Sequence, residues 1–135
     1  MAMVSRKGVL AIAAVVDVAL HARDRPVSAR TLAAHHRLPP RHLEPVLQAL
    51  VRHGILKGIR GPHGGYALGR ERKRISAEDI VRAANLDDQT DPPLPASALL
   101  NDVLRPALAE AERAFASALA RISIDDIARR AEALK

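Results

Sequence analysis

Apolar residues recur at three- and four-residue steps along most of the chain, which is the period of helices that bury one side. The first such stretch covers residues 5–21 and is predicted to be a helix. Asp17, His21 and Arg23 fall three or four apart, or nearly so, and are expected on its solvent side. The sequence "DRP" at 24–26 ends this helix. Its buried stripe is expected to be Val9, Ile12, Ala13, Val16 and Leu20.

Two short helices joined by a tight turn are predicted next. Ser28 stands at an N-cap position before "ARTLAAHH", where Leu32 is expected to point inward. "RLPP" at 37–40 is a turn, because consecutive prolines remove amide donors. The following helix ends near Arg52, and Gly54 lies just past its end. The pair has the outline of a helix-turn-helix. The inner face of its second helix is expected to be Leu43, Val46, Leu47 and Leu50.

A β-hairpin is predicted directly after these helices. "ILKGIR" and "YALGR" have strand character, and "GPHGG" between them supplies the turn. A phosphate-binding loop would need Lys-Ser/Thr after its glycines and a helix behind them, and neither follows here. This absence argues against a nucleotide-using enzyme, and we expect no enzyme activity. A helix-turn-helix followed by a basic-tipped hairpin is the order of a winged helix.

The second half of the chain is predicted to be helical as well. Ser76 is expected to cap a helix "AEDIVRAA", and the proline-rich "NLDDQTDPPLP" at 85–95 is expected to be a linker. A long helix over 96–121 follows, in which Pro106 either causes a kink or marks the start of the main part. A last helix covers 124–134. The long helix carries an apolar seam that favours a partner helix, formed by Leu100, Leu104, Ala107, Ala111, Ala118 and Ile122.

These elements predict a mostly α fold with a small hairpin wing. We expect a winged helix-turn-helix DNA-binding unit over 1–84, the linker over 85–95, and a dimerisation helix with a C-terminal helix over 96–135. The apolar run near the N-terminus is interrupted by Asp17 and is far too short to span a membrane. We therefore expect a cytoplasmic protein that does not bind membranes.

Charge is divided unevenly between the two halves of the chain. Residues 1–75 carry fourteen Lys and Arg against four Asp and Glu, whereas residues 76–135 carry seven against eleven. A basic first half predicts a contact with nucleic acid or another anionic surface. Tyr66 and Phe115 are the only aromatic residues, and binders of single strands stack bases on exposed rings. Double-stranded DNA is therefore the expected partner.

The third helix carries side chains that can distinguish base pairs. Arg can fork onto guanine, Gln can pair with adenine, and Glu can accept a hydrogen bond from cytosine. The hairpin tip adds Arg60 and His63, which suit the negative potential of a minor groove. Once its core positions are removed, the outer face of the helix consists of Arg41, His42, Glu44, Pro45, Gln48, Ala49 and Arg52.

Six histidines raise the question of a metal site, above all His35, His36 and His42. Adjacent side chains on a helix point about 100° apart, so His35 and His36 are not expected to face one ion. The chain has no Cys, which excludes disulfides and thiolate ligands. We expect surface imidazoles, with no metal and no cofactor.

Residues 42–70, "HLEPVLQALVRHGILKGIRGPHGGYALGR", with "ISAEDIVRA" after them, closely resemble the winged-helix regulators of the Rrf2 family, which include IscR, NsrR and CymR. The family's wing pattern Arg-Gly-Pro-x-Gly-Gly-Tyr-x-Leu is matched throughout 60–68, and "SRKGVLAI" matches its opening. The resemblance implies a homodimer that crosses over through the long helix and binds an imperfect inverted repeat in promoter DNA. Carried over by position, it implies DNA contacts by Arg41, His42, Glu44 and Arg60, and a phosphate contact by Lys7.

The sequence departs from this family in two places. Several members hold an iron–sulfur cluster with three Cys before the long helix, and this chain has no Cys. A cluster of that kind is therefore excluded, and the protein either responds to another effector, a small molecule or a protein, or is not regulated by a ligand. Pro45 would cost a hydrogen bond if the third helix began at Pro40, so we expect it to begin nearer His42.

The expected function is a sequence-specific, cluster-free transcription regulator that acts as a repressor. Arg41, His42, Glu44 and Gln48 would read bases, and the three cations Lys7, Arg52 and Arg60 would attract phosphates. An adaptor that keeps the fold but binds no DNA remains the alternative, although the basic first half argues against it.

Overall fold

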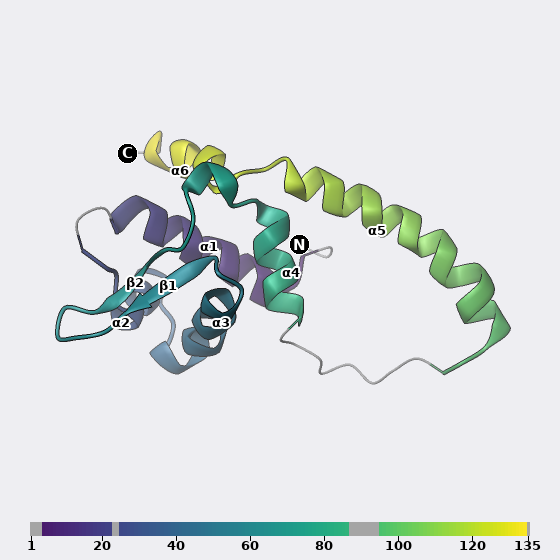
Figure 1. Cartoon of the computed structure of the whole chain (residues 1–135), viewed down its shortest axis with the longest axis horizontal. Coiled ribbons are helices and arrows are strands. Elements are labelled where there is room, and N and C mark those ends of the chain that lie inside the picture. Colours follow the sequence, from purple (N-terminus) through teal and green to yellow (C-terminus); the bar gives the residue numbers. More distant parts are fainter. Residues whose placement is uncertain (1–3, 23–24, 87–94, 135) are drawn as a thin grey trace.

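The computed structural model describes residues 4–22, 25–86 and 95–134, and it confirms a mostly helical fold with one antiparallel hairpin (Figure 1). In chain order the elements are α1 (Arg6–His21), α2 (Ala29–His35), α3 (Pro40–Arg52), β1 (Leu56–Ile59), β2 (Gly65–Leu68), η1 (Arg72–Arg74), α4 (Ala77–Leu86), η2 (Leu99–Leu104), α5 (Arg105–Ala120) and α6 (Ile124–Glu132).

Serine side chains fix the start of several helices, as the sequence predicts for two of them. Ser28 Oγ accepts a hydrogen bond from the Thr31 amide at 3.1 Å, and Ser76 Oγ accepts one from the Asp79 amide at 3.0 Å. Each bond satisfies an amide that has no partner within its helix. After α3, Gly54 adopts a φ of 74°, the left-handed conformation expected just past a helix end.

Helix α1 lies at the centre of the core, in contact with α4, α6, α3 and α2 and with strand β2. The inward residues predicted for α2 and α3 are confirmed, since Leu32, Leu43, Val46, Leu47 and Leu50 are all buried. Helix α6 adds Ile124 and Ala128 to the same cluster. The C-terminal helix therefore shares its core with the winged helix, whereas the predicted division at residues 85–95 remains a prediction.

The face that α1 turns to the core differs from the predicted one. Of the predicted stripe, Val16 is buried, Ile12 and Leu20 pack against the core, and Val9 is 40% exposed. The most deeply buried residues are instead Ala11, Ala14, Val15 and Val18. Because α1 is apolar on nearly all sides, its periodicity does not single out one inner face. Asp17, expected on the solvent side, is only 6% exposed. Among the described helices, α1 included, none is both long and apolar enough to cross a bilayer.

Helix α3 begins at Pro40 and not nearer His42, which corrects the expected start. Pro40 occupies the first turn, where an amide would have no helical partner in any case. Pro45 lies inside the helix and removes one backbone hydrogen bond, a cost that the buried face of α3 offsets. Ala49, expected on the outer face, is buried.

Pro106 marks the point where a short π-helical segment becomes α5. The Arg105 amide donates to the Leu100 carbonyl, five residues back, and Pro106 then occupies the first turn of α5. This favours the expectation that a first turn ends near Pro106 and the main helix starts there. No residue of η2 or α5 is buried, and α5 extends from the body as an arm (Figure 1). Of the predicted linker, Asn85 and Leu86 complete α4, and 87–94 lie outside the described residues.

Candidate DNA-binding surface

The outer side of α3 is held in place by its buried side. Four of its side chains anchor it in the core, so the side chains between them, at Arg41, His42, Glu44 and Gln48, are exposed. Arg41 and His42 lie in the first turn, since the helix begins at Pro40. The residues predicted to read bases therefore lie on one exposed helix.

The start of α1 meets the start of α3 at a surface hollow of about 480 Å³. Lys7 and His42 both line it, so the structure brings together two residues that the sequence places 35 positions apart. Arg6 also lines this hollow and is exposed, and the sequence reasoning did not single it out. Two basic side chains from the first turn of α1 therefore lie beside the first turn of α3.

A second hollow, of about 430 Å³, separates α3 from the hairpin. Gln48 lines it from the helix, and Arg60 and Tyr66 line it from the hairpin. Gln48 Nε2 donates a hydrogen bond to Tyr66 Oη at 3.4 Å. Tyr66 was not predicted as a site residue, although it is the tyrosine of the matched wing pattern and the chain's single tyrosine.

The hairpin depends on close backbone packing that only glycine permits. The Gly64 amide donates to the Gly61 carbonyl at 2.9 Å, which closes the turn after β1. A Cβ on Gly64 would overlap the Ile59 carbonyl oxygen, and Gly61 has a φ of 117°. Tyr66 exchanges two backbone hydrogen bonds with Val27, at 2.8 and 3.0 Å, which hold β2 against the segment before α2. The glycine-rich stretch is thus a turn, as predicted, and not a phosphate loop.

The remaining two predicted residues lie at the margins of this surface. His63 is exposed at the hairpin tip, but it lines a different hollow, of about 390 Å³, together with Ser28, Thr31 and His35 of the α2 side. Arg52 is exposed in the last turn of α3, about 16 Å along the helix axis from Arg41. Gln48 and Arg60, by contrast, line one hollow.

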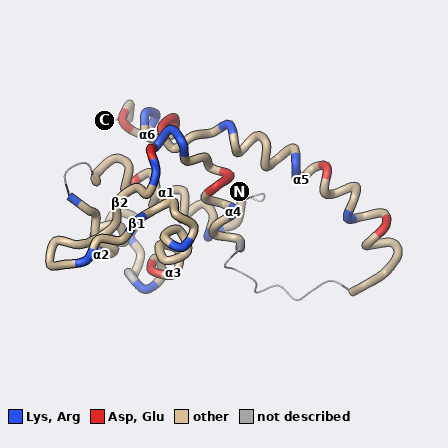
Figure 2. The backbone as a smooth tube through the Cα atoms, viewed as in Figure 1, with Lys and Arg blue, Asp and Glu red and all other residues tan. Residues whose placement is uncertain are grey.

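Basic residues are spread over the winged body, and acidic residues lie on α4, on α6 and along α5 (Figure 2). Lys and Arg mark the opening of α1, the α2–α3 turn, the hairpin and the turn η1. The acidic residues of the second half lie on α4 and α6 as well as on the arm, so the uneven division of charge along the sequence is not a division between the body and the arm.

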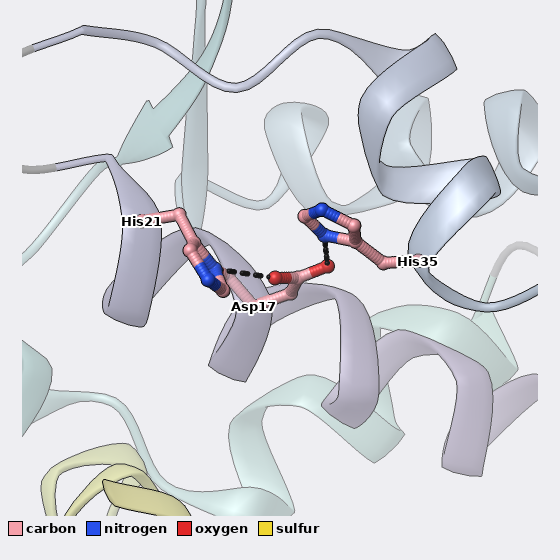
Figure 3. Close-up of side chains that lie close together, drawn as sticks. All are labelled: Asp17, His21 and His35. Atoms are coloured by element: carbon pink, nitrogen blue, oxygen red, sulfur yellow. Dashed lines mark hydrogen bonds and ion pairs between the residues drawn. The ribbon is translucent and has the colours of Figure 1, made fainter. Parts of the chain in front are cut away.

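A cluster of one carboxylate and three imidazoles lies behind this surface and was not predicted. Asp17 Oδ1 lies 2.6 Å from His21 Nδ1, and Asp17 Oδ2 lies 2.8 Å from His35 Nδ1 (Figure 3). His36 Nε2 lies 3.3 Å from the same Oδ2. His35 and His36 were not expected to face one ion, yet both approach the same carboxylate oxygen, because His36 is the C-cap of α2 and has left the helix, with ψ at 7°. The i, i+4 spacing of Asp17 and His21 was the signal available in the sequence.

Comparison with known proteins agrees with this architecture. Residues 4–130 match the Rrf2 family, described as iron-dependent transcriptional regulators. The chain is 34% identical over 85 residues to the HTH-type transcriptional regulator IscR of Xenorhabdus nematophila, an alignment that covers 63% of this chain and 51% of that protein. The chain therefore spans about half the length of the curated relatives it matches.

Solved structures with similar folds cover nearly the whole chain. T. potens IscR superposes with a TM-score of 0.76 at 28% sequence identity. The superposition covers 98% of this chain and 90% of the T. potens chain. CymR, the global cysteine regulator of B. subtilis, gives a TM-score of 0.72 at 26% identity and covers 96% of this chain and 98% of its own. These relatives are transcriptional regulators and not enzymes.

Proposed function

The chain belongs to the Rrf2 family of transcriptional regulators, and on that premise we propose that it binds double-stranded promoter DNA and represses transcription. It does so as a homodimer on an imperfect inverted repeat and without an iron–sulfur cluster. The observation that carries the proposal is the surface that extends from Lys7 and His42 across α3 to Gln48 and Arg60. Helix and hairpin present it on one side of a basic body, as docking on a duplex requires.

The exposed side chains divide into two roles on that surface. Arg41, His42, Glu44 and Gln48 on α3 face the base edges of a major groove, where their donors and acceptors can distinguish base pairs. Lys7, Arg52 and Arg60 contact phosphates on either side and supply a salt-dependent attraction. His63 at the hairpin tip reaches the neighbouring minor groove, whose narrow parts attract cationic side chains.

Two unpaired apolar surfaces support the homodimer. Leu99, Val103 and Leu108 are exposed on η2 and α5, and neither segment buries a residue within its own chain. A groove of about 720 Å³ follows the stripe of α1, from Val9 to Leu20, toward the end of α5. Apolar surface of this extent is rare on a monomer and is usually covered by a partner. A second copy offers both surfaces in complementary positions, as two-fold symmetry requires.

Repression requires only occupancy of the site. A dimer that covers both half-sites of a promoter excludes polymerase by volume, so no further contact surface is needed. Because the chain has no Cys, the thiolate ligands of a cluster are absent, and occupancy cannot depend on a cluster of that kind.

Selection of bound sequences from a random duplex library, followed by fluorescence anisotropy at two salt concentrations, tests the proposal. We expect an enriched inverted repeat that is bound by two copies and more weakly at the higher salt. A reporter gene behind that repeat should be silenced when the protein is expressed. Absence of binding to any duplex at either salt would instead support an adaptor that binds no DNA.

A further inference from the structure

We propose that Asp17, His21, His35 and His36 form a binding site for one divalent cation of the zinc class. The site lies outside the DNA-binding surface, on α1 and at the C-terminal end of α2. It does not depend on the proposed function, since binding of the ion can be measured without DNA.

Three of the four groups already lie around one centre. One ligand atom from each of Asp17, His21 and His35 lies within 4.8 Å of the other two, as Figure 3 shows for these side chains. The rings of His21 and His35 lie with their centroids 5.2 Å apart and are tilted by 47° to each other. His36 Nε2 adds a fourth atom, 3.3 Å from Asp17 Oδ2. Two nitrogens and one oxygen therefore surround a small volume, and the His36 nitrogen lies beside that oxygen.

This donor set matches the preference of zinc. Zinc takes four ligands in a tetrahedron, with bonds of about 2.0–2.1 Å to imidazole nitrogen and carboxylate oxygen. Ligand atoms around such an ion lie roughly 3.4 Å apart, so the Asp17–His35 contact of 2.8 Å would widen slightly. The His21 and His35 side chains are 44% and 41% exposed, which leaves their rings room to turn. Calcium and magnesium prefer oxygen ligands and do not fit.

Two buried groups of the cluster would be stabilised by a bound ion. The carboxylate of Asp17 is almost fully buried, and its ion-pair partners among the described residues are imidazoles. A buried charge is costly unless it is paired or coordinates a metal. His36 Nε2 is buried and makes no hydrogen bond, and a buried nitrogen of this kind is the exception in native proteins. One cation satisfies both groups, with the imidazoles losing the protons that they otherwise share with the carboxylate.

An ion can reach the cluster from the surface. His21 and His35 line a hollow together with Ser28, Thr31 and His63, and Gln48 does not line it. All four residues of the cluster also line the apolar groove along α1, so the site can be reached from that groove as well. The ion would connect α1 to the end of α2, where the Leu38 amide bonds to the Ala33 carbonyl at 2.9 Å and the chain turns into α3.

Metal binding by the full chain tests the proposal. The protein is stripped with a chelator and titrated with Zn²⁺ against a chromophoric competitor, and Co²⁺ absorption reports the ligand geometry. We expect one Zn²⁺ per chain, tetrahedral Co²⁺ bands and no binding of Mg²⁺. His35→Gln or His21→Gln should bind Zn²⁺ at least about tenfold more weakly, because even the loss of a residue that only hydrogen-bonds to a ligand costs that much affinity. The control His42→Gln removes an exposed imidazole of α3 and should leave the affinity unchanged.

Two results would overturn the proposal. In the first, the wild type binds Zn²⁺ no more tightly than His35→Gln does; in the second, His42→Gln loses as much Zn²⁺ affinity as His35→Gln. Circular dichroism of each stripped variant separates a lost ligand from a lost fold. Asp17→Asn provides the second measurement, because it keeps the size of the buried side chain while it weakens coordination, and an unchanged Zn²⁺ affinity in this variant would also contradict the site.

Discussion

Arg72 Nε lies 2.8 Å from Asp125 Oδ1, and this contact joins the turn after the hairpin to the first turn of α6. Arg129 Nε approaches the other Asp125 oxygen at 3.2 Å. The backbone reinforces the junction, since the Ile124 amide donates to the Ile75 carbonyl at 2.8 Å. The C-terminal helix is therefore fastened to the base of the hairpin, although the sequence separates them by some fifty residues.

Removal of Asp125 should destabilise the whole fold. Asp125→Ala leaves the partly buried Arg72 guanidinium without its close carboxylate, and we expect a loss of about 2–3 kcal/mol in the free energy of unfolding by urea. The control Glu110→Ala removes an exposed carboxylate from α5 and should change stability by less than about 0.5 kcal/mol. Equal effects of the two substitutions would show that the Arg72 contact contributes nothing.

The hairpin should tolerate an added methyl group at Gly58 in strand β1 and not at Gly64 in the turn. Gly64→Ala places a Cβ on the Ile59 carbonyl oxygen, so the turn must open, and we expect a clear loss of DNA affinity. Gly58→Ala lies in β1, where a Cβ meets no atom within 4 Å, and it should bind DNA as the wild type does. Anisotropy titrations of both variants measure the difference. Equal affinity for Gly64→Ala and wild type would remove the hairpin from the binding surface.

The parts of the fold that the sequence predicts well are those in which local and tertiary preferences agree. In α3 the apolar period coincides with the buried face, and in the hairpin the glycines stand where the turn needs them. Helix α1 could not be predicted in this way, because its apolar residues surround it and only packing decides which are buried. The position of His36 depends on where α2 ends, and a single residue at a helix end is beyond what a pattern resolves.

Arg60 should contribute affinity without base preference. Arg60→Ala removes one exposed cation from the hairpin, so binding should weaken similarly for all duplexes. The slope of log affinity against log salt should become shallower by about one. Arg113→Ala, which removes an exposed arginine from α5, is the matched control and should keep the wild-type slope. An altered base preference with an unchanged slope would contradict the phosphate role of Arg60.

Acid should weaken the start of α6 through one carboxylate. The Arg129 guanidinium, then the Ser123 hydroxyl and amide, lower the pKa of Asp126 below its ordinary value of 3.8. A carboxylate with a lowered pKa stabilises the fold above its unfolded pKa, and this contribution is lost as pH falls through the folded pKa. Below pH 3.8 the unfolding free energy of Asp126→Asn should therefore decrease less steeply with falling pH than that of the wild type. Urea titrations at several pH values measure this, and parallel curves for the two proteins would contradict it.

The arm formed by η2 and α5 should control assembly. Leu108→Glu places a charge on an exposed apolar side chain of α5, so the monomer should fold normally, whereas a dimer must bury the carboxylate. A penalty of about 3 kcal/mol corresponds to a dimer dissociation constant raised roughly a hundredfold. Leu134→Glu, at a leucine beyond α6 that is 88% exposed against 58% for Leu108, is the control.

Sedimentation equilibrium over a range of concentrations measures the dissociation constant for both variants. Because the two half-sites of a repeat are held by one dimer, Leu108→Glu should also lower the affinity for the full repeat toward that for a single half-site. If Leu108→Glu sediments as the wild type does and keeps full affinity for the repeat, the arm is not the dimer interface. If Leu108→Glu sediments as a monomer but keeps full affinity for the repeat, two monomers bind the half-sites independently. Dimerisation through the arm would then serve another purpose.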